Sequence, residues 1–219
     1  MLKAVLFDMD GVIVDTEPLH RKAYFKMFQE VKINVSESRY VSFTGQSTIN
    51  ICRQLCVEFS LSQAPETLVA LKRKHFKHLF ENDSSLALLD GVLDLIKEYH
   101  QNGLALVLAS SASMPNIDRI FNRFDLNQYF IAKLSGADLK ASKPHPEIFI
   151  KAAQASGYAP HECFVIEDST NGIQAAKEAN IFCVGYNSKH STNQDYSLAD
   201  RVINHFHEIT LDRIKPQFD

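Results

Sequence analysis

The sequence predicts an α/β protein that carries a parallel sheet and a separate, all-helical insertion. Uninterrupted apolar runs, typical of strands buried on both faces, recur along the chain. From about residue 88 these runs alternate with segments of helical spacing, which indicates βαβ units with right-handed crossovers. Between residues 17 and 86 the pattern is helical and shows no convincing strand. These observations together place the insertion after the first strand.

The first strand is predicted over 4–7, four apolar residues that lead directly into Asp8, Asp10 and Gly11. If the strand continues to Asp10, the two carboxylates point to the same side, because residues two apart share a face. Two anions this close in an apolar setting favour a divalent cation between them. Gly11 lets the backbone turn and leaves room for a ligand. A plain strand end with two solvated aspartates remains the alternative from this stretch alone.

Three helices are predicted in the insertion. Pro18 suits the start of the first, residues 49–59 have helical spacing, and Pro65 suits the start of the third. We therefore expect a core domain of residues 1–15 and 88–219 and a helical cap of residues 16–87. In the core, further strands are expected at 104–109, 130–134, 163–166, 181–186 and 202–203, and helices at 91–102, 116–124, 146–156 and 173–179.

The composition is that of an ordinary globular protein, with 219 residues, 45% hydrophobic and 22% charged, and a formal net charge of −3. The mild acidity argues against a general nucleic-acid binder. The absence of a membrane-length apolar run and of a recognisable signal peptide predicts a cytoplasmic protein without a membrane partner. The four cysteines are interpreted as reduced, mostly buried thiols. We expect a monomer or a weak dimer.

Polar side chains follow four of the predicted strands, at the edge where open α/β sheets bind ligands. They are Asp8 and Asp10, Ser110 and Ser111, Lys143 in the loop before Pro144, and Glu167 with Asp168. Each has an ordinary explanation alone, such as a helix cap for a serine or a solvated loop for a lysine. Their joint placement at one edge indicates a site.

This set of residues suits phosphoryl transfer through an enzyme carboxylate. Asp8 is the predicted nucleophile that forms an aspartyl-phosphate, and Asp10 is the predicted general acid and then base. Ser110 can donate a hydrogen bond to a phosphoryl oxygen, and Lys143 can place a positive charge against it. Met9, Gly11 and Ser111 are expected to contribute to phosphate binding.

Magnesium is the predicted cofactor, because it takes hard oxygen ligands and keeps some of its water molecules. The expected ligands are the carboxylates of Asp8 and Asp168 and the carbonyl oxygen of Asp10. Glu167 is a further candidate, either as a direct ligand or through a neighbouring one.

Four stretches of the chain resemble, in order and spacing, the four signature motifs of the haloacid dehalogenase (HAD) superfamily. They read DMDGVIVDT, LASSAS, ASKPHPEIF and VIEDSTNGIQAAKEA. The branch that is most similar is the β-phosphoglucomutase-like one, whose helical cap is inserted after the first strand. The resemblance covers about residues 3–186 and implies a Rossmann-like core and Mg²⁺ dependence. It also implies the roles given above for Asp8, Asp10, Ser110, Lys143 and Asp168.

The cap carries specificity in this family, and here the resemblance is partial. His20 and Lys74 match cap residues of the sugar-phosphate mutase, the first in coupling cap to core and the second in substrate contact. The basic run 72–75 is interpreted as one solvated helix flank, with some of it facing the cleft, rather than as a nucleic-acid patch. The mutase holds a second phosphate with an arginine in a Gly-x-Ser-Arg-like stretch, whereas the stretch 45–48 here ends in Thr48. Arg53 could substitute for that arginine or could be an ordinary solvated helix residue.

Three functions follow from these observations. The first is a Mg²⁺-dependent phosphatase for a small phosphorylated metabolite, most simply a sugar phosphate. The alternative is a β-phosphoglucomutase-type mutase that uses the same aspartyl-phosphate. A non-catalytic phosphoacceptor or binding module is the third, and Asp10 argues against it, because a pure acceptor needs no acid/base two residues from its nucleophile.

Overall fold

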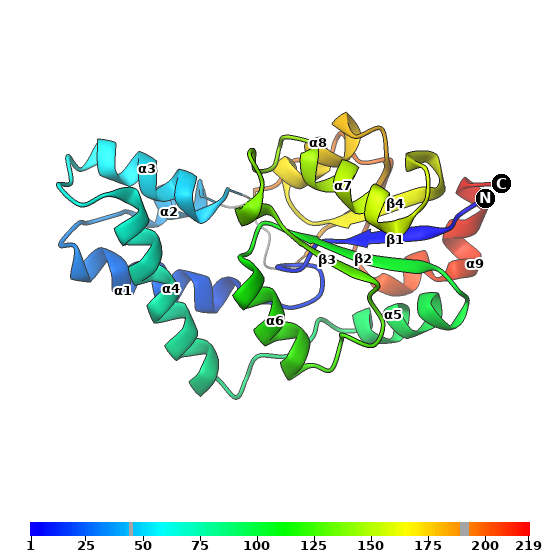
Figure 1. The fold of residues 1–219 in the computed structure, drawn as a ribbon, viewed down its shortest axis with the longest axis horizontal. Coiled ribbons are helices and arrows are strands. Elements are labelled where there is room, and N and C mark those ends of the chain that lie inside the picture. Colours follow the sequence, from blue (N-terminus) through cyan, green and yellow to red (C-terminus); the bar gives the residue numbers. More distant parts are fainter. Residues whose placement is uncertain (44–45, 189–192) are drawn as a thin grey trace. The chain divides into compact units, whose positions relative to one another are not determined.

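The protein is described by a computed structural model that covers residues 1–43, 46–188 and 193–219 (Figure 1). The chain divides into two compact units. The core unit comprises Met1–Asp15 and Ala87–Asp219, and the helical unit comprises Thr16–Leu86. Residue 87, which the sequence analysis assigned to the insertion, belongs to the core unit. Within the described ranges, no helix is both long and apolar enough to cross a membrane.

Six strands of the described chain form one parallel sheet, in the order β3-β2-β1-β4-β5-β6. They are β1 (Ala4–Phe7), β2 (Ala105–Ser110), β3 (Ala132–Ser135), β4 (Cys163–Glu167), β5 (Phe182–Tyr186) and β6 (Arg201–Ile203). The predicted α/β fold with a parallel sheet is therefore confirmed. β1 lies between β2 and β4, with Phe7 paired to Leu108 and Ile166. The carboxyl ends of these three strands thus meet at one place.

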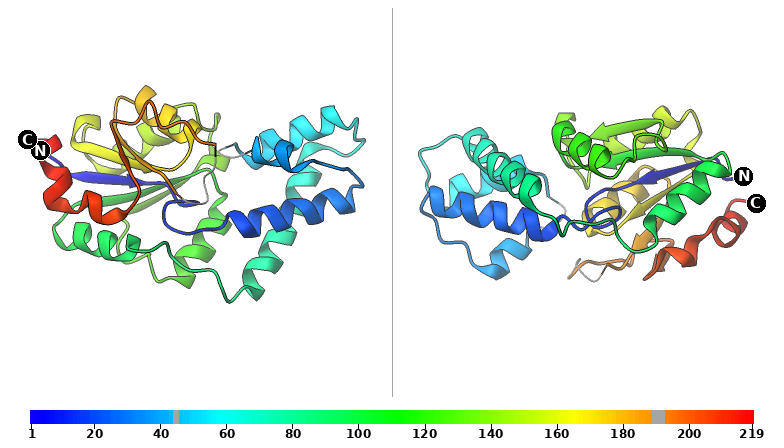
Figure 2. Two further views of the ribbon diagram at one scale, coloured as in Figure 1. Left: turned by 180° about the vertical axis from the view of Figure 1, so that it is seen from behind. Right: turned by 90° about the horizontal axis from the view of Figure 1, so that it is seen from below.

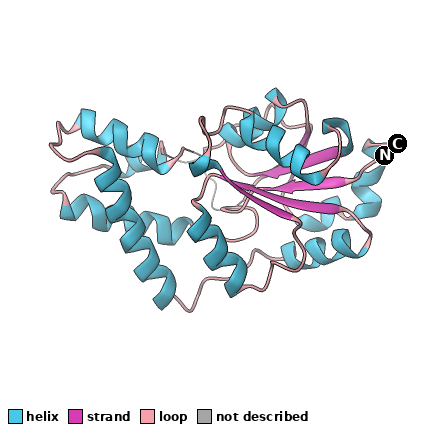
Figure 3. Cartoon of the chain, viewed as in Figure 1, coloured by secondary structure: helices cyan, strands magenta, loops and turns pink. Residues whose placement is uncertain are grey.

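Helices cover both faces of this sheet, as Figures 2 and 3 show. On one face, α7 (Glu147–Ser156) and α8 (Thr170–Glu178) pack their apolar side chains against Leu6 and its neighbours. On the other face lie α5 (Val92–Gln101) and α6 (Met114–Arg123). There the ring of Tyr99 contacts those of Phe7 and Phe164. Because both faces are covered, β1 is entirely apolar, and β2 and β4 are apolar up to the polar residue at their carboxyl ends.

Short elements that the sequence did not predict complete the core unit. They are η1 (Gly136–Asp138), η2 (Pro160–Glu162), η3 (Phe206–Ile209), α9 (Leu211–Ile214) and η4 (Lys215–Gln217). The last three follow β6. They bring Phe218 against Phe164 and Phe182, so the end of the chain packs on the sheet.

The helical unit has its own apolar core. It contains α1 (Glu17–Glu30), α2 (Glu37–Val41), α3 (Thr48–Glu58) and α4 (Pro65–Asn82), and its core includes Met27, Leu55 and Leu68. The three predicted helices are confirmed, with prolines in the first turns of α1 and α4. The sequence analysis missed α2. This short helix begins where the side chain of Ser36 accepts a hydrogen bond from the Arg39 N–H.

Candidate active site

The loop after β1 brings the two aspartates together. The strand predicted over residues 4–7 is confirmed, and it does not continue to Asp10, because β1 ends at Phe7. The N–H groups of residues 12–14 all donate to the carbonyl oxygen of Met9, and Asp10 pairs with Val14 in an isolated bridge. A tight loop, rather than strand alternation, therefore places Asp10 beside the strand end. The Met9 side chain is fully buried, so its predicted contact with phosphate would have to come from its backbone.

Asp8 stands at the end of β1 and is held from two sides. Its N–H donates to the Ile166 carbonyl of β4 at 3.0 Å. Its Oδ1 accepts a hydrogen bond from Lys143 Nζ at 2.6 Å. The same ammonium donates to Glu167 Oε1 at 2.5 Å and to the Ala109 carbonyl at 3.0 Å. Three acceptors match the three N–H donors of an ammonium, so Lys143 is fully engaged in joining the ends of β1, β2 and β4.

The electrostatics of this cluster favour additional positive charge. Burial raises the pKa of Asp8 to about 8; Glu167 and Asp10 also raise it, while Lys143 lowers it. Burial lowers the pKa of Lys143, but Asp8 and Glu167 raise it above its usual value, so the side chain stays protonated. One ammonium thus bonds to two buried carboxylates, with the charge of Asp10 nearby. A divalent cation would stabilise the charged form of Asp8 that a nucleophile requires.

Glu167 is the anchor of the turn that follows β4. Its Oε2 accepts hydrogen bonds from the N–H groups of Asp168 and Ser169, both at 3.0 Å, and from the Ser169 hydroxyl at 2.9 Å. A Cβ at position 172 would lie 1.9 Å from Glu167 Cδ, so only glycine fits there. Both carboxylate oxygens of Glu167 are therefore bound to the protein, which favours a positioning role over direct metal ligation.

Asp168 reaches across from this turn to the loop after β1. A Cβ at Gly11 would lie 2.1 Å from Asp168 Oδ2, and Gly11 has a φ of +86°. Both the close approach and the left-handed backbone require glycine here. The carboxylate of Asp168 therefore lies directly against the loop that carries Asp8 and Asp10.

These residues fit the hard oxygen donor set of Mg²⁺. The carboxylates of Asp8 and Asp168 and the carbonyl of Asp10 come from two adjacent turns, and the cluster is rich in negative charge. In the described part of the chain, no three His, Cys, Asp or Glu side chains form a ready-made metal cage. A magnesium site does not need one, because carbonyl oxygens, water molecules and a substrate phosphate complete the octahedron.

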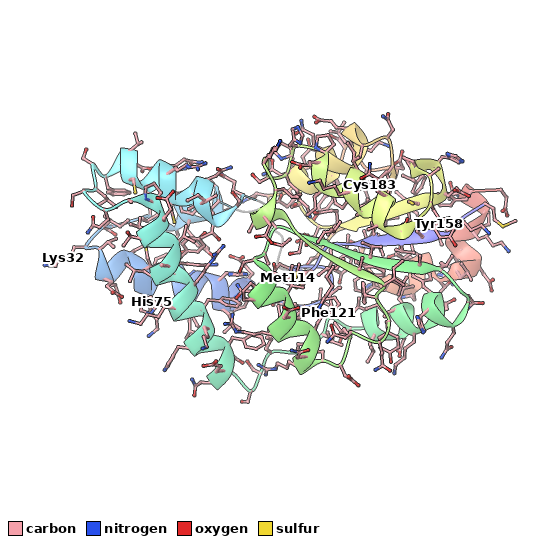
Figure 4. The ribbon with its side chains drawn as sticks, in the orientation of Figure 1. Lys32, His75, Met114, Phe121, Tyr158 and Cys183 are labelled. Carbon is pink, nitrogen blue, oxygen red and sulfur yellow. The ribbon has the colours of Figure 1, made fainter. Side chains whose placement is uncertain are left out.

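The end of β2 presents hydroxyl and backbone groups beside the strand that carries Asp8. Ser110 is 1% exposed, and its Oγ accepts a hydrogen bond from the Ala112 N–H at 3.0 Å. The cap position of α6 falls on Ser113, so Ser110 is not a helix cap. Ser111 is half-buried in the same loop, which leads to Met114 at the start of α6 (Figure 4).

Sequence reasoning missed Ser135 at this loop. Its hydroxyl donates to the Ala112 carbonyl at 2.9 Å and fixes the loop from the neighbouring strand. Its position opposite Ser110 depends on the register of β2 and β3, which the sequence analysis did not predict.

In the helical unit, a different lysine from the predicted one is buried. The helix flank 72–75, predicted to be solvated with some of it facing the cleft, contains one buried lysine, since Lys72 is only 4% exposed. Its Nζ lies 2.7 Å from His20 Nδ1 and 4.8 Å from the centre of the Tyr24 ring. Lys74, the predicted substrate contact, is exposed. The spacing of Leu68, Lys72 and Phe76 on one helix face could have shown this, because residues four apart share a face.

The other predicted cap residues are divided between the buried cluster and the surface. Thr48 begins α3 and is half-buried; burial raises the pKa of Tyr24 in the cluster around Lys72, and Thr48 partly lowers it. Arg53 is exposed and donates to Asn50 Oδ1 at 3.4 Å. Gly45, at the start of the predicted phosphate-binding stretch, lies outside the described residues.

A further polar pair in this unit was not predicted. The Tyr40 hydroxyl donates to Glu17 Oε1 at 2.7 Å, which brings α2 and α1 together. The sequence offered no sign of it, because α2 itself was not predicted.

Comparison with known proteins matches this architecture. The model of the haloacid dehalogenase-like hydrolase family matches residues 5–186. Hexitol phosphatase B of Escherichia coli (strain K12) is 27% identical over 208 residues, covering 94% of each chain. Beta-phosphoglucomutase of Bacillus subtilis (strain 168) is 27% identical, covering 100% of this chain and 96% of that protein. The structure of CbbY from Rhodobacter sphaeroides in complex with phosphate has a TM-score of 0.87 at 25% identity, covering 98% of this chain and 100% of that one.

The family match runs from β1 through β5 and includes both turns that form the acidic cluster. It also includes the whole helical unit. The chain therefore belongs to the haloacid dehalogenase-like hydrolases, as the four sequence motifs predicted.

Proposed function

We propose that the protein is a Mg²⁺-dependent phosphatase that acts on a small phosphorylated metabolite of the sugar-phosphate class. The observation that carries the proposal is the buried Asp8, bound to Lys143 and lying beside Asp10 at the carboxyl edge of the sheet. The similarity to hexitol phosphatase B and to beta-phosphoglucomutase supports a phosphorylated carbohydrate as substrate. The helical unit, with His20 and Lys72 clustered in it, is the proposed source of substrate specificity.

The reaction proceeds in two transfers. A carboxylate oxygen of Asp8 attacks phosphorus, and the bond from phosphorus to the ester oxygen breaks. Asp10 donates a proton to the departing alcohol. Asp10, now ionised, then takes a proton from a water molecule that attacks the aspartyl-phosphate. Inorganic phosphate leaves and the carboxylate of Asp8 is restored, so atoms and charges balance over the cycle.

The surrounding residues hold the reacting groups in place. Lys143 fixes Asp8 through Oδ1 and places positive charge beside the transferred group. Glu167 holds Lys143 from the other side, and the Ser110–Ser111 turn offers donors to the phosphoryl oxygens. Magnesium bound by Asp8, Asp168 and the Asp10 carbonyl would supply further charge to stabilise the transferred phosphoryl group.

A turnover screen tests this proposal. The purified protein is incubated with a panel of hexose, pentose and hexitol phosphates, with Mg²⁺ or with excess chelator, and phosphate release is measured. We expect Mg²⁺-dependent release from at least one sugar phosphate. Undiminished release in chelator would contradict the metal requirement, and a panel without any turnover would contradict the phosphatase assignment.

A phosphosugar mutase is the second candidate, favoured by the full-length similarity to beta-phosphoglucomutase. A mutase must hold a bisphosphate, and the second dianion needs a cationic partner such as a bidentate guanidinium. Thr48 stands at the position where the resemblance would require arginine, and a threonine offers a single neutral donor. We therefore propose that water usually accepts the phosphoryl group from Asp8.

Measuring phosphate release and hexose phosphate isomerisation in the same sample separates the two candidates. With a bisphosphate activator present, we expect release to exceed isomerisation. Isomerisation that greatly exceeds release would establish the mutase instead, and Arg53 would be the first residue to substitute.

A further inference from the structure

A segment beyond the family match contacts the turn that carries Asp168. The match ends at residue 186, whereas the hydroxyl of Tyr196 donates to the Asp168 carbonyl oxygen at 3.0 Å. The Asp168 N–H is itself bound to Glu167 Oε2 at 3.0 Å. Both backbone polar groups of Asp168 are thus fixed, one from within the turn and one by Tyr196.

The same segment also binds the other side of the turn. The Thr170 N–H donates to Gln194 Oε1 at 2.8 Å, and the Asp195 N–H donates to Thr170 Oγ1 at 2.8 Å. These bonds hold the residue where α8 begins, two positions after Asp168. The segment 194–196 is therefore hydrogen-bonded to the residues on both sides of Ser169, namely Asp168 and Thr170.

Tyr196 is itself well anchored. A Cβ at Gly185 would lie 2.9 Å from Tyr196 Cδ1, so the ring packs directly on the backbone of β5. Tyr196 and Ala199 both pack against the apolar cluster between the sheet and α7 and α8. The hydroxyl is consequently presented to Asp168 from a ring that packs on the sheet.

We propose that Tyr196 is a positioning residue for Mg²⁺ binding, an inference that rests on the proposed function. By holding the Asp168 backbone, it keeps the carboxylate against Gly11, where it would ligate the metal. A ligand whose backbone is already fixed loses less conformational freedom when the metal binds. Hydrogen bonds that orient metal ligands are typically worth about 10- to 100-fold in metal affinity.

The test compares Tyr196→Phe with the wild-type protein by calorimetric titration with MgCl₂ in the absence of substrate. We expect Mg²⁺ to bind roughly tenfold more weakly, the lower end of the range for such bonds. At saturating Mg²⁺, kcat should change less than about twofold, because the ligand set is intact. Tyr158→Phe is the matched control, since Tyr158 lies at the opposite end of the sheet and is 37% exposed (Figure 4).

The outcomes separate this inference from the proposed function. Wild-type protein that neither binds Mg²⁺ nor turns over a phosphate ester would overturn both. Wild-type binding with an unchanged dissociation constant in Tyr196→Phe would overturn the inference alone. Thermal unfolding in chelator shows whether the variant keeps its fold. If the variant is less stable, the titration is repeated at a temperature well below its unfolding midpoint, and an unchanged dissociation constant there would overturn the inference.

Discussion

Among the residues that the structure describes, two lysines are buried, Lys72 and Lys143, and their surroundings differ in kind. In the core unit, Lys143 bonds to the carboxylates of Asp8 and Glu167. In the helical unit, Lys72 lies against the imidazole of His20 and the rings of Tyr24 and Phe76. A cation between carboxylates holds anionic groups together, whereas a cation over aromatic rings is stabilised by the electron-rich faces of those rings. We propose that Lys143 holds the catalytic carboxylates in place and that Lys72 contributes to substrate binding.

The largest expected effect concerns the partner of the first lysine. Asp8→Asn should abolish turnover, by at least about 10⁴-fold, since an amide cannot form an acyl-phosphate. Phosphate release under saturating Mg²⁺ measures it. Asp94→Asn, on the exposed side of α5, is the control and should retain wild-type activity. Near wild-type turnover by Asp8→Asn would remove the nucleophile assignment.

Asp10→Asn should have a smaller effect. It removes the general acid and base but leaves the nucleophile, so turnover should fall by roughly 10²- to 10⁴-fold. A substrate with a good leaving group, such as a nitrophenyl phosphate, needs less protonation and should lose less in the first transfer. An equal loss for good and poor leaving groups, with formation of the phospho-enzyme rate-limiting, would argue against the acid role.

Lys143→Met tests the organising role through stability. The substitution leaves Asp8 and Glu167 buried without their shared cation, which should cost about 3–5 kcal/mol in the free energy of unfolding. Urea unfolding in chelator measures this loss. A change below about 1 kcal/mol would mean that the cluster tolerates the missing charge and that the ion pairs do not organise it.

Lys72→Met completes the comparison with the same substitution in the other unit. The methionine keeps most of the contact with Tyr24 and Phe76, so the free energy of unfolding should change by less than about 1.5 kcal/mol. The Michaelis constant for sugar phosphates should rise about tenfold, with a weaker effect on a small aromatic phosphate ester. A large loss of stability without a change in the Michaelis constant would assign Lys72 a structural role.

The core site could be predicted largely from the sequence, for a simple physical reason. Parallel strands end at one edge of the sheet, so residues that follow apolar runs meet there whatever the intervening helices do. This is why Asp8, Lys143 and Glu167, far apart in the chain, were expected in one place, where both carboxylates accept hydrogen bonds from Lys143. The exact course of the loop to Asp10 could not be predicted. It depends on hydrogen bonds to the Met9 carbonyl that leave no pattern in the side chains.

The helical unit was harder to predict. A helix face is shared by residues three or four apart, so a run of basic residues contains both buried and exposed members. Lys72 faces inward and Lys74 outward, and composition alone cannot separate them. The contact made by Tyr196 could not be predicted from the sequence, for a different reason. Tyr196 acts through its hydroxyl on a backbone carbonyl 28 residues earlier, and no motif marks such a contact.

Lys143 joins the ends of three strands through groups that lie 135, 34 and 24 residues away in the chain. Its three bonds can exist together only when β1, β2 and β4 are all in register. The ammonium therefore cross-links the ends of the three central strands. Because Asp8 is held by this cross-link, catalytic activity should require that the three strand ends stay together. Any opening that separates one of these strands should silence the enzyme while most of its helices are still folded.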